Sequence, residues 1–242
     1  MNHLVMYVMT QTAAEISIII PVLNEQKGIV FFLKHLQNFR PNCQLIIVDG
    51  GSDDDTVELA RPYVDKVLQA PTGRAQQMNR GAKESVAPIL LFLHADTFLP
   101  EDAVIQIKQA IVRQYRWGRF DIKLMSGHPA LTIIACFMNW RSKLTGIATG
   151  DQAIFVEKDF FETSGAYPDI ALMEDVALSK KLSKVAKPCC ISSKVSSSAR
   201  RWLQFGIVKM TLLMWWLRLR YFLGNSPSSL AQLYREGLFW KR

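Results

Sequence analysis

His94 and Asp96 are the side chains in this sequence whose types and spacing most clearly suggest chemistry. They follow four apolar residues at positions 90–93, and such a run predicts a strand buried on both faces of a parallel sheet. The two side chains then lie at the carboxyl end of that strand, where open α/β sheets bind ligands, and on an extended backbone they point the same way. Together they can bind a divalent cation. Alternatively, one of them binds the cation and the other binds a sugar hydroxyl. The plainer alternative is that Asp96 caps the helix expected near residue 101.

Three further loops carry acids, amides or arginine beside a strand end or a helix start. They are residues 24–25, 49–54 and 73–79. Because the carboxyl ends of parallel strands meet at one edge of a sheet, we expect these loops to converge with His94 and Asp96. Acids beside arginines suit a metal-bridged diphosphate. As alternatives, residues 52–54 are ordinary helix caps and residues 73–79 a solvated helix start.

The elements that position these loops alternate through the first half of the chain. Strands are expected at residues 16–20, 44–48, 66–68 and 90–93, and helices at 24–38, 57–61, from 73 onward and at 101–114. This order predicts an α/β fold with a mostly parallel central sheet and helices on both faces. In the second half we expect a strand at 117–124, an apolar helix at 129–140, a loop at 145–153 leading into a strand, a loop at 160–168, and a helix at 173–185.

The two ends of the chain differ from the main domain, which we expect to span residues 15–200. Residues 1–14 predict a flexible arm, because their apolar patch is too short for a signal peptide or a membrane span. Residues 201–242 form an apolar, basic helical tail whose densest part, residues 202–217, is shorter than the roughly 20 residues that cross a bilayer. Its tryptophan, phenylalanine and arginine content suits a helix in the membrane interface, and the alternative is a helix buried against the sheet.

The composition narrows the class of partner. The chain has 242 residues, 49% of them hydrophobic, and a formal charge of +8. This charge favours a nucleotide diphosphate, an acidic membrane surface or nucleic acid, and because no nucleic-acid-binding motif is present we expect no nucleic-acid partner. The four cysteines lack metal-ligand spacing. They indicate reduced thiols and hence a cytoplasmic location, with association at the inner face of the membrane left open.

Five short motifs, in order, are similar to those of the family 2 glycosyltransferases. They are residues 20–25, 48–56 and 93–96, the pair Gly150 and Asp151, and the pair Glu174 and Asp175. The resemblance extends over residues 16–202 and implies the GT-A fold, which is Rossmann-like. Residues 73–79 and 200–202 resemble most a bacterial subgroup described as "transferase 2, rSAM/selenodomain-associated". The activity implied is inverting transfer of a sugar from a UDP- or GDP-sugar to a hydroxyl of a small-molecule or lipid acceptor.

The resemblance also implies which residues bind the donor. Pro21, Asn24 and Glu25 would line the base and ribose of the nucleotide. Asp49 would contact the base or the ribose, and Arg74 would reach the base or the diphosphate. These residues are therefore the expected donor-binding set, together with His94 and Asp96.

The resemblance assigns the metal and the catalytic base in the same way. Asp96 matches the last carboxylate of the family's Asp-X-Asp motif, which binds Mg²⁺ or Mn²⁺ so that the departing diphosphate is neutralised. Asp175 matches the general base that takes the proton of the acceptor hydroxyl. Without the resemblance, the favourable effect of acids at a helix N-terminus would be the preferred explanation of Glu174 and Asp175. The expected acceptor or diphosphate contacts are Asp151, Glu174, Arg201 and Trp202, with Arg200 beside them.

Two residues depart from the family pattern. His94 replaces the first acid of Asp-X-Asp, so it contacts either the metal or the ribose. Gly50 stands where the family often has an aspartate that helps to select uridine, and the base is therefore open between uracil and guanine.

Other classes of protein fit the sequence less well. A sugar-phosphate nucleotidyltransferase would have a glycine-rich loop after the first strand, but residues 21–25 contain no glycine. A dinucleotide-binding dehydrogenase would have a Gly-X-Gly-X-X-Gly loop after a strand, which is absent from the sequence. A non-catalytic peripheral membrane or interaction protein with a decayed sugar-nucleotide site is the third alternative, and His94 is its best support.

Overall fold

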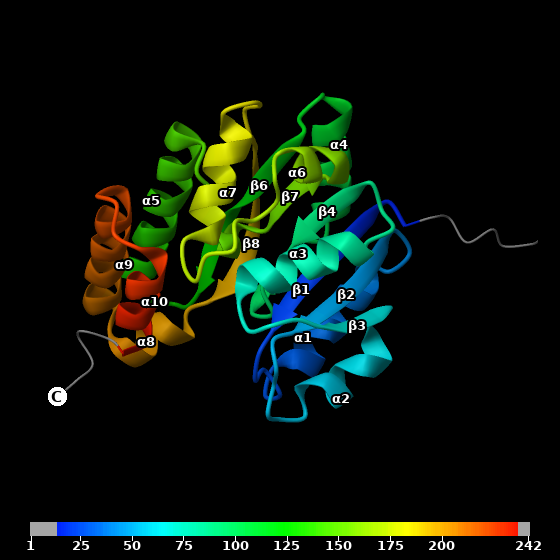
Figure 1. Cartoon of the computed structure of the whole chain (residues 1–242), viewed down its shortest axis with the longest axis horizontal. Coiled ribbons are helices and arrows are strands. Elements are labelled where there is room, and N and C mark those ends of the chain that lie inside the picture. The colour runs from blue at the N-terminus through cyan, green and yellow to red at the C-terminus, as the bar shows by residue number, and fades with distance from the viewer. Residues whose placement is uncertain (1–13, 237–242) are drawn as a thin grey trace, which may run out of the picture.

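The computed structural model describes residues 14–236, and within this range eight strands form one mixed sheet in the order β3-β2-β1-β4-β7-β6-β8-β5 (Figure 1). The arm predicted for residues 1–14 lies outside the described residues except for Ala14. Four of the seven neighbouring pairs among these strands are parallel, namely β1 with β2, β1 with β4, β2 with β3, and β6 with β8. The remaining pairs are antiparallel.

The first half of the chain supplies the parallel strands β1 to β4, as the alternation of strands and helices predicts, and the short strand β5 at the opposite edge of the sheet. Its elements are β1 (Ile16–Val22), α1 (Ile29–Leu36), η1 (Gln37–Phe39), β2 (Cys43–Asp49), α2 (Thr56–Ala60), η2 (Arg61–Tyr63), β3 (Lys66–Gln69), α3 (Arg74–Glu84), β4 (Ile89–Phe92), β5 (Thr97–Phe98) and α4 (Ala103–Val112). All residues of β1, β2 and β4 are buried, because helices cover both faces of these strands.

Pro21 does not end β1, which continues to Val22. The Ile19 carbonyl accepts a hydrogen bond from Leu93 N on the β4 side, so Pro21, two residues later, faces the same side. The pairing of β1 with β4 stops at Ile19 and Phe92. Pro21 lacks an N–H group, but the β1–β4 ladder has already ended at this position, so no hydrogen bond of the ladder is lost.

The second half of the chain adds the mixed half of the sheet. Its elements are β6 (Trp117–Met125), α5 (Pro129–Thr145), η3 (Gly150–Gln152), β7 (Ile154–Glu157), α6 (Lys158–Thr163), α7 (Glu174–Ser183) and β8 (Cys189–Ser198). Residues 160–168 were expected to form a loop, but Phe160 and Phe161 are buried in α6. Strand β8 was not anticipated from the sequence. It is serine-rich, and Ile191 and Val195 are the two apolar residues that it buries in the core.

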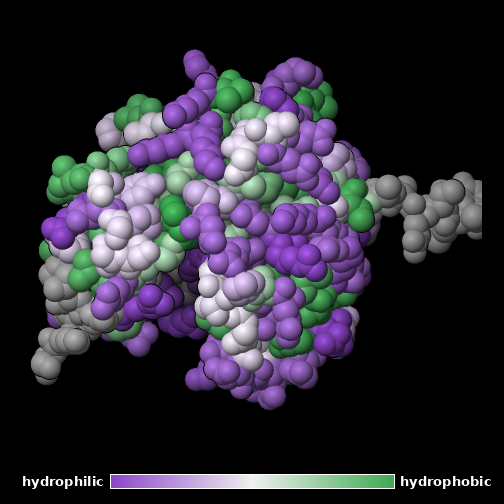
Figure 2. Space-filling model, viewed as in Figure 1, coloured by the Kyte–Doolittle hydropathy of each residue, from purple (hydrophilic) through white to green (hydrophobic). Residues whose placement is uncertain are grey.

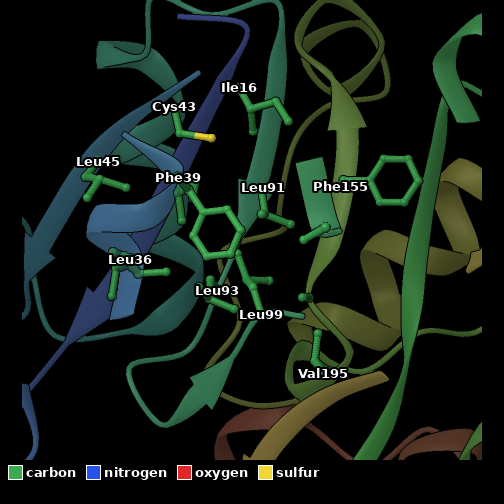
Figure 3. Packing of buried hydrophobic residues seen from close by; sticks show 14 of the residues in the cluster. Ile16, Leu36, Phe39, Cys43, Leu45, Leu91, Leu93, Leu99, Phe155 and Val195 are labelled. Atoms are coloured by element: carbon green, nitrogen blue, oxygen red, sulfur yellow. The ribbon is translucent and has the colours of Figure 1, made fainter. Parts of the chain in front are cut away.

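Two apolar clusters hold helices to the two faces of the sheet. One contains side chains of α1, α4 and α5 packed on β1, β2 and β4, including Leu36, Leu91 and Phe155 (Figure 3). The other joins α3, α6 and α7 to the opposite face through Met78, Phe161 and Leu178 among others. Because both faces are covered, the polar loops at the strand ends are the natural place for a ligand.

Three helices follow β8, where one long apolar helix was expected. They are α8 (Arg200–Phe205), α9 (Ile207–Phe222) and α10 (Pro227–Glu236). Gly206, with a φ of 91°, separates α8 from α9, and this left-handed φ region suits glycine far better than other residues. A third apolar cluster, which includes Met210, Leu213 and Leu217 of α9, packs these helices against Met173 and Val176. None of the helices in residues 14–236 has the length and apolar character that crossing a membrane would require.

Candidate active site

The carboxyl ends of β1, β2 and β4 are joined side by side. Gly50 N donates to Val22 O at 3.0 Å, and Leu93 N donates to Ile19 O at 3.0 Å. The side chain of Gln77, buried in α3, donates to both Val22 O and Val48 O at 2.8 Å. A Cβ on Gly50 would lie 3.0 Å from this amide. Gln77 therefore lies beside Gly50, the position where the family often has an aspartate. The sequence did not single out Gln77.

The loop after β1 is bound to the loop after β2 and does not continue into helix α1, whose start was expected near residue 24. Asn24 takes a φ of 54°, its N–H donates to Ser52 Oγ at 3.0 Å, and its side-chain oxygen accepts from Asp53 N at 2.8 Å. Glu25 N donates to Thr56 Oγ1 at 2.9 Å. These bonds delay the helix until Ile29 and keep Asn24 and Glu25 at the sheet edge.

Asp49 is only 2% exposed and stabilises its own loop. Its carboxylate accepts hydrogen bonds from Gly51 N, Ser52 N and Ser52 Oγ at 2.6 to 3.1 Å. These are three donors, and Ser52 N is shared between the two carboxylate oxygens, so much of the acceptor capacity of Asp49 is used within the loop. The structure therefore gives Asp49 a loop-forming role, and the predicted contact with base or ribose stays a prediction.

His94 and Asp96 lie in a turn, whereas the sequence analysis assumed an extended backbone. Thr97 N donates to His94 O at 3.0 Å, which closes the turn after β4. The capping alternative for Asp96 does not hold, because α4 starts at Ala103 with Asp102 at its N-cap position. The turn replaces the extended backbone on which the two side chains were expected to point the same way.

The His94 ring lies directly against Gly150. A Cβ on Gly150 would come within 2.5 Å of Cε1 and Nε2 of the ring, so a glycine is needed here. Gly150 N also donates to Asp175 Oδ2 at 2.8 Å. Burial lowers the pKa of His94 well below its usual value, and the cationic Arg74 and Arg201 lower it further, so the imidazole is neutral at pH 7.

The charge of Asp96 acts on two other carboxyl groups of the site, those of Glu25 and Asp151. Burial raises the pKa of Glu25. The positive charge of Arg200 acts against this rise, and the negative charge of Asp96 adds to it. Burial also raises the pKa of Asp151, to which Asp175 and Asp96 contribute by repulsion. Asp151 Oδ1 is buried and has no hydrogen-bond partner among the described residues. The site therefore concentrates negative charge that a cation would relieve.

Glu174 and Asp175 begin α7, next to Arg74 at the start of α3. Glu174 is 5% exposed, and burial together with the Asp175 charge raises its pKa to about 7, while Arg74 lowers it. Burial raises the pKa of Asp175, although Gly150 N and Val176 N donate to its carboxylate at 2.8 and 2.7 Å. The fold thus brings together Arg74, predicted for the donor, with Glu174 and Asp175, predicted for the acceptor and the base.

Arg141 is a site residue that the sequence analysis missed. Arg141 Nε and Nη2 are buried without hydrogen-bond partners among the described residues. Burial lowers the pKa of Arg141, and the charges of Asp151 and Asp175 partly offset that effect. An arginine inside an apolar helix was the available signal for Arg141.

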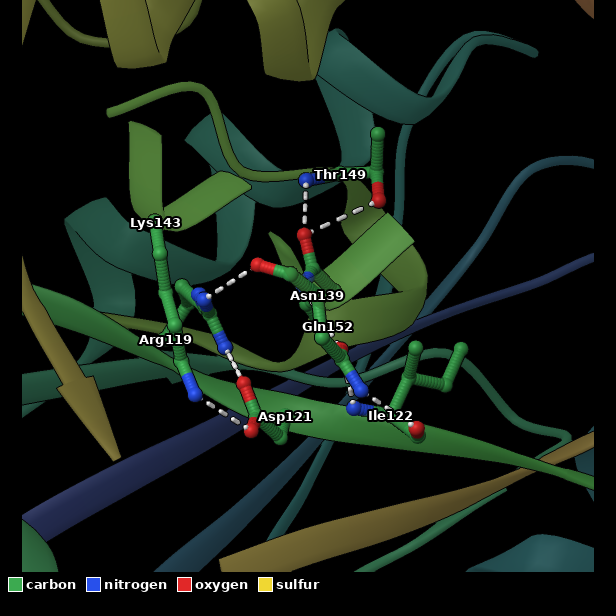
Figure 4. Close-up of polar contacts among 7 residues, drawn as sticks. All are labelled: Arg119, Asp121, Ile122, Asn139, Lys143, Thr149 and Gln152. Carbon is green, nitrogen blue, oxygen red and sulfur yellow. Dashed lines mark hydrogen bonds and ion pairs between the residues drawn. The ribbon is translucent and has the colours of Figure 1, made fainter. Parts of the chain in front are cut away.

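A buried polar network supports the segment that carries Gly150 and Asp151 (Figure 4). Arg119, which is 0% exposed, pairs with Asp121 and donates to Asn139 O at 3.2 Å. The Asn139 side chain bonds the main chain of Ile122. Gln152 donates to Asn139 Oδ1 at 3.5 Å and accepts from Thr149 N at 3.1 Å. Strand β6 and helix α5 thereby fix η3, and with it the position of Asp151.

The basic residues after β8 reach the same site from the other side. Arg200 Nη2 lies 3.9 Å from Glu25 Oε2. Arg201 hydrogen-bonds Tyr234 of α10 and lowers the pKa of His94 through its charge. A pocket of about 500 Å³ opens beside them, lined by Arg200, Arg201, Gln204, Phe205, Met210, Tyr234 and Arg235. Trp202 instead packs against the apolar cluster of α9.

These residues would hold a divalent cation only together with oxygen atoms of a bound donor. Within residues 14–236 there is no group of three or more His, Cys, Asp or Glu side chains that would hold a metal. Asp96, with neighbouring carboxylates and the unpartnered Asp151 oxygen, offers a hard oxygen site that diphosphate oxygens would complete.

Residues 17–129 match the model of glycosyl transferase family 2. The 4,4'-diaponeurosporenoate glycosyltransferase of Staphylococcus haemolyticus (strain JCSC1435) is 33% identical over 122 residues. This match covers 47% of the chain and 32% of the relative, so the chain aligns with about a third of that protein's length. The resemblance seen in the motifs is therefore confirmed over residues 17–129, the part of the chain that matches the model of glycosyl transferase family 2. The finer likeness to the bacterial subgroup stays a prediction.

Solved structures share the fold at low sequence identity. S. aureus TarS 1-349 in complex with UDP-GlcNAc has a TM-score of 0.63 and 16% identity, over 76% of this chain and 58% of that chain. Mannosyltransferase PcManGT from Pyrobaculum calidifontis, in complex with GDP-Man and Mn²⁺, has a TM-score of 0.65 and 16% identity, over 94% of this chain and 70% of that chain. The expected GT-A-like α/β fold is confirmed.

Proposed function

We propose that the protein is a glycosyltransferase that moves a sugar from a nucleotide-diphosphate sugar to an acceptor hydroxyl with inversion. The observation that carries the proposal is the position of Asp175. Its carboxylate is oriented by Gly150 N and Val176 N beside the His94–Asp96 turn, and burial raises its pKa. TarS and PcManGT, which share the fold, bind UDP-GlcNAc and GDP-Man.

In the proposed reaction Asp175 is the general base. The acceptor oxygen attacks the anomeric carbon, its proton passes to the Asp175 carboxylate, and the bond to the diphosphate breaks on the opposite face of the sugar. A carboxylate with a raised pKa holds this proton more readily than an ordinary one. Arg74 and Arg201 supply positive charge toward the departing diphosphate.

Asp96 would hold Mg²⁺ or Mn²⁺ together with the diphosphate oxygens of the donor. A divalent cation supplies charge neutralisation of the leaving diphosphate. The neutral His94 would contact the ribose, because its ring is fixed against Gly150. Pro21, Asn24 and Glu25, at the end of β1, would line the base and ribose.

The acceptor would enter between the start of α7 and the pocket beside Arg200 and Arg201. Asp151 and Glu174 would lie along this path, and Arg141 would hold Asp151 and Asp175 in place by charge. Trp202 would support the side of this path formed by the residues after β8, through its packing on α9. The structure supports this route for the acceptor. The chemical class of the acceptor, a small molecule or a lipid, stays a prediction.

A thermal-shift panel tests the donor site. UDP, GDP, a UDP-sugar and a GDP-sugar are each added with and without Mn²⁺, and a ligand that binds only the folded state raises the Tm. We expect a Mn²⁺-dependent rise with one base and a smaller or no rise with the other. If none of the eight conditions shifts the Tm, the donor site is decayed and the protein belongs to the non-catalytic class.

A further inference from the structure

Helices α5 and α9 each expose a continuous apolar stripe. The stripe of α5 is Ile133, Phe137, Trp140 and Leu144, and that of α9 is Val208, Leu212, Trp215, Leu219 and Phe222. Each of these side chains is between 53% and 71% exposed. The spacing of three and four residues places each set on one side of its helix. We call the two stripes together the α5/α9 face.

The stripe on α9 is not needed to attach the helix to the domain. Met210, Leu213 and Leu217, on another side of α9, are buried in the third apolar cluster and make that attachment. Helix α9 is therefore apolar on two sides, one packed and one exposed. Exposed apolar surface of this extent marks an interaction site, because monomeric soluble proteins rarely carry it without a partner.

The two stripes lie at the same edge of the molecule. Helix α5 ends at Thr145, and Ile147, two residues later, packs against the cluster that holds α9. Figure 1 shows both helices at the end of the molecule away from β3, and Figure 2 shows hydrophobic side chains along this edge. An apolar groove of about 410 Å³ runs along α5 between Thr132, Ile133, Cys136, Phe137 and Trp140.

The charge around this edge identifies the partner. Residues 129–145 and 200–235 contain eight arginines and lysines and no aspartate or glutamate, and the chain as a whole has a net charge of +8. The charges include Lys143 on α5, and Lys209, Arg218 and Arg220 on α9. A second copy of the chain would bring this acid-free surface against itself, which like-charge repulsion opposes. An anionic bilayer offers both the apolar interior and the opposite charge.

We propose that the α5/α9 face docks on the surface of an anionic bilayer, with both helices in the interface plane. The aromatic and aliphatic side chains of the two stripes enter the boundary between headgroups and acyl chains, and the arginines and lysines contact the lipid phosphates. The groove on α5 accommodates part of one acyl chain. This surface includes α5, whereas the sequence drew attention only to the tail.

Vesicle co-sedimentation tests the proposal with the full chain and needs no donor or acceptor. The probes are vesicles of phosphatidylcholine alone and of phosphatidylcholine with about 30% phosphatidylglycerol. We expect binding to the anionic vesicles, weaker binding as NaCl is raised, and little binding to neutral vesicles, since charge attraction is screened by salt.

Matched substitutions locate the docking face. Phe137→Glu on α5 and Trp215→Glu on α9 should each reduce vesicle binding by about tenfold or more. Phe31→Glu, at a side chain of α1 that is 73% exposed but lies elsewhere, should leave it unchanged. Far-UV circular dichroism checks that all three variants are folded, and a misfolded variant is replaced by Phe137→Ser or Trp215→Ser.

Two results would overturn the proposal. One is equal vesicle binding by the wild type and the two face variants. The other is a dimer in sedimentation velocity, disrupted by Phe137→Glu or Trp215→Glu, in a protein that does not bind the anionic vesicles. That second result would assign the face to a second copy of the chain.

Discussion

The main-chain N–H of Gly150 donates to Oδ2 of Asp175 at 2.8 Å, and the same glycine leaves the space that the His94 ring occupies. One residue thus connects the turn after β4, which carries Asp96, to the start of α7, which carries Asp175. The proposed metal-binding and base groups are held in register by a contact that only glycine permits.

Gly150→Ala should impair the reaction more than it impairs folding. The new Cβ would lie 2.5 Å from the His94 ring, so the ring or the η3 segment must move and the bond to Asp175 weakens. We expect a loss of about 1–3 kcal/mol in the free energy of unfolding and at least a tenfold loss in transfer. Gly127→Ala is the control, because a Cβ there meets nothing within 4 Å. Equal activity of the two variants would contradict this role of Gly150.

Glu174→Gln should change how stability depends on pH. The folded-state pKa of Glu174 is about 7, above its ordinary value of 4.5, so between these pH values the folded state binds a proton that the unfolded state has released. Stability therefore falls as the pH rises from 4.5 through 7, by about 3 kcal/mol in total. Urea unfolding at several pH values should show this fall in the wild type and in the control Glu162→Gln, at an exposed side chain, and a smaller fall in Glu174→Gln. Identical slopes in all three proteins would exclude the raised pKa.

Asp96→Ala should remove the Mn²⁺ dependence of donor binding. By calorimetry, we expect the affinity for the nucleoside diphosphate that binds the wild type to fall about tenfold or more with Mn²⁺ present, and to change little without it. Asp159→Asn, at an acid in the first turn of α6, is the control. A Mn²⁺-enhanced affinity that survives in Asp96→Ala would place the metal elsewhere.

Arg119→Met should destabilise the domain strongly, because it leaves the carboxylate of Asp121 buried with Lys143 as its remaining ion-pair partner. Removal of one member of a buried pair costs about 3–5 kcal/mol. The exposed Arg113→Met serves as the comparison, and Arg119→Met combined with Asp121→Leu should recover much of the loss. A loss below 1 kcal/mol in thermal or urea unfolding would mean that the network of Figure 4 is not what fixes η3.

The elements that the sequence predicts well are those with an unambiguous apolar pattern. Strands β1, β2 and β4 consist mostly of apolar or β-branched residues, and they are buried as such strands require. Strand β8 was missed because its ten residues include five serines, and its place in the sheet depends on pairing with β6 and β5. The start of α1 was misplaced because the loop after β2 binds the N–H groups of Asn24 and Glu25, a tertiary contact that helix signals do not contain.

The site residues also divide into those that local motifs predict and those that depend on tertiary contacts. The motifs locate Asp96, Asp151 and Asp175, and the fold brings them together at one edge of the sheet. Arg141 belongs to the site only through its proximity to distant segments, and its local signal, a charge inside an apolar helix, does not by itself place it there. His94 and Asp96 were expected to point the same way on an extended backbone, but the backbone turns here, closed by the hydrogen bond from Thr97 N to His94 O.

The most direct test of the account is Asp175→Asn, measured for donor binding and for transfer in parallel. The amide keeps the shape of the carboxylate but cannot take the acceptor proton, so we expect donor affinity in Mn²⁺ within a few-fold of the wild type and a transfer rate lower by about 10²–10⁴-fold. In the wild type the rate should rise with pH through the raised pKa of Asp175. Transfer by Asp175→Asn at the wild-type rate would contradict the assignment of Asp175 as the base.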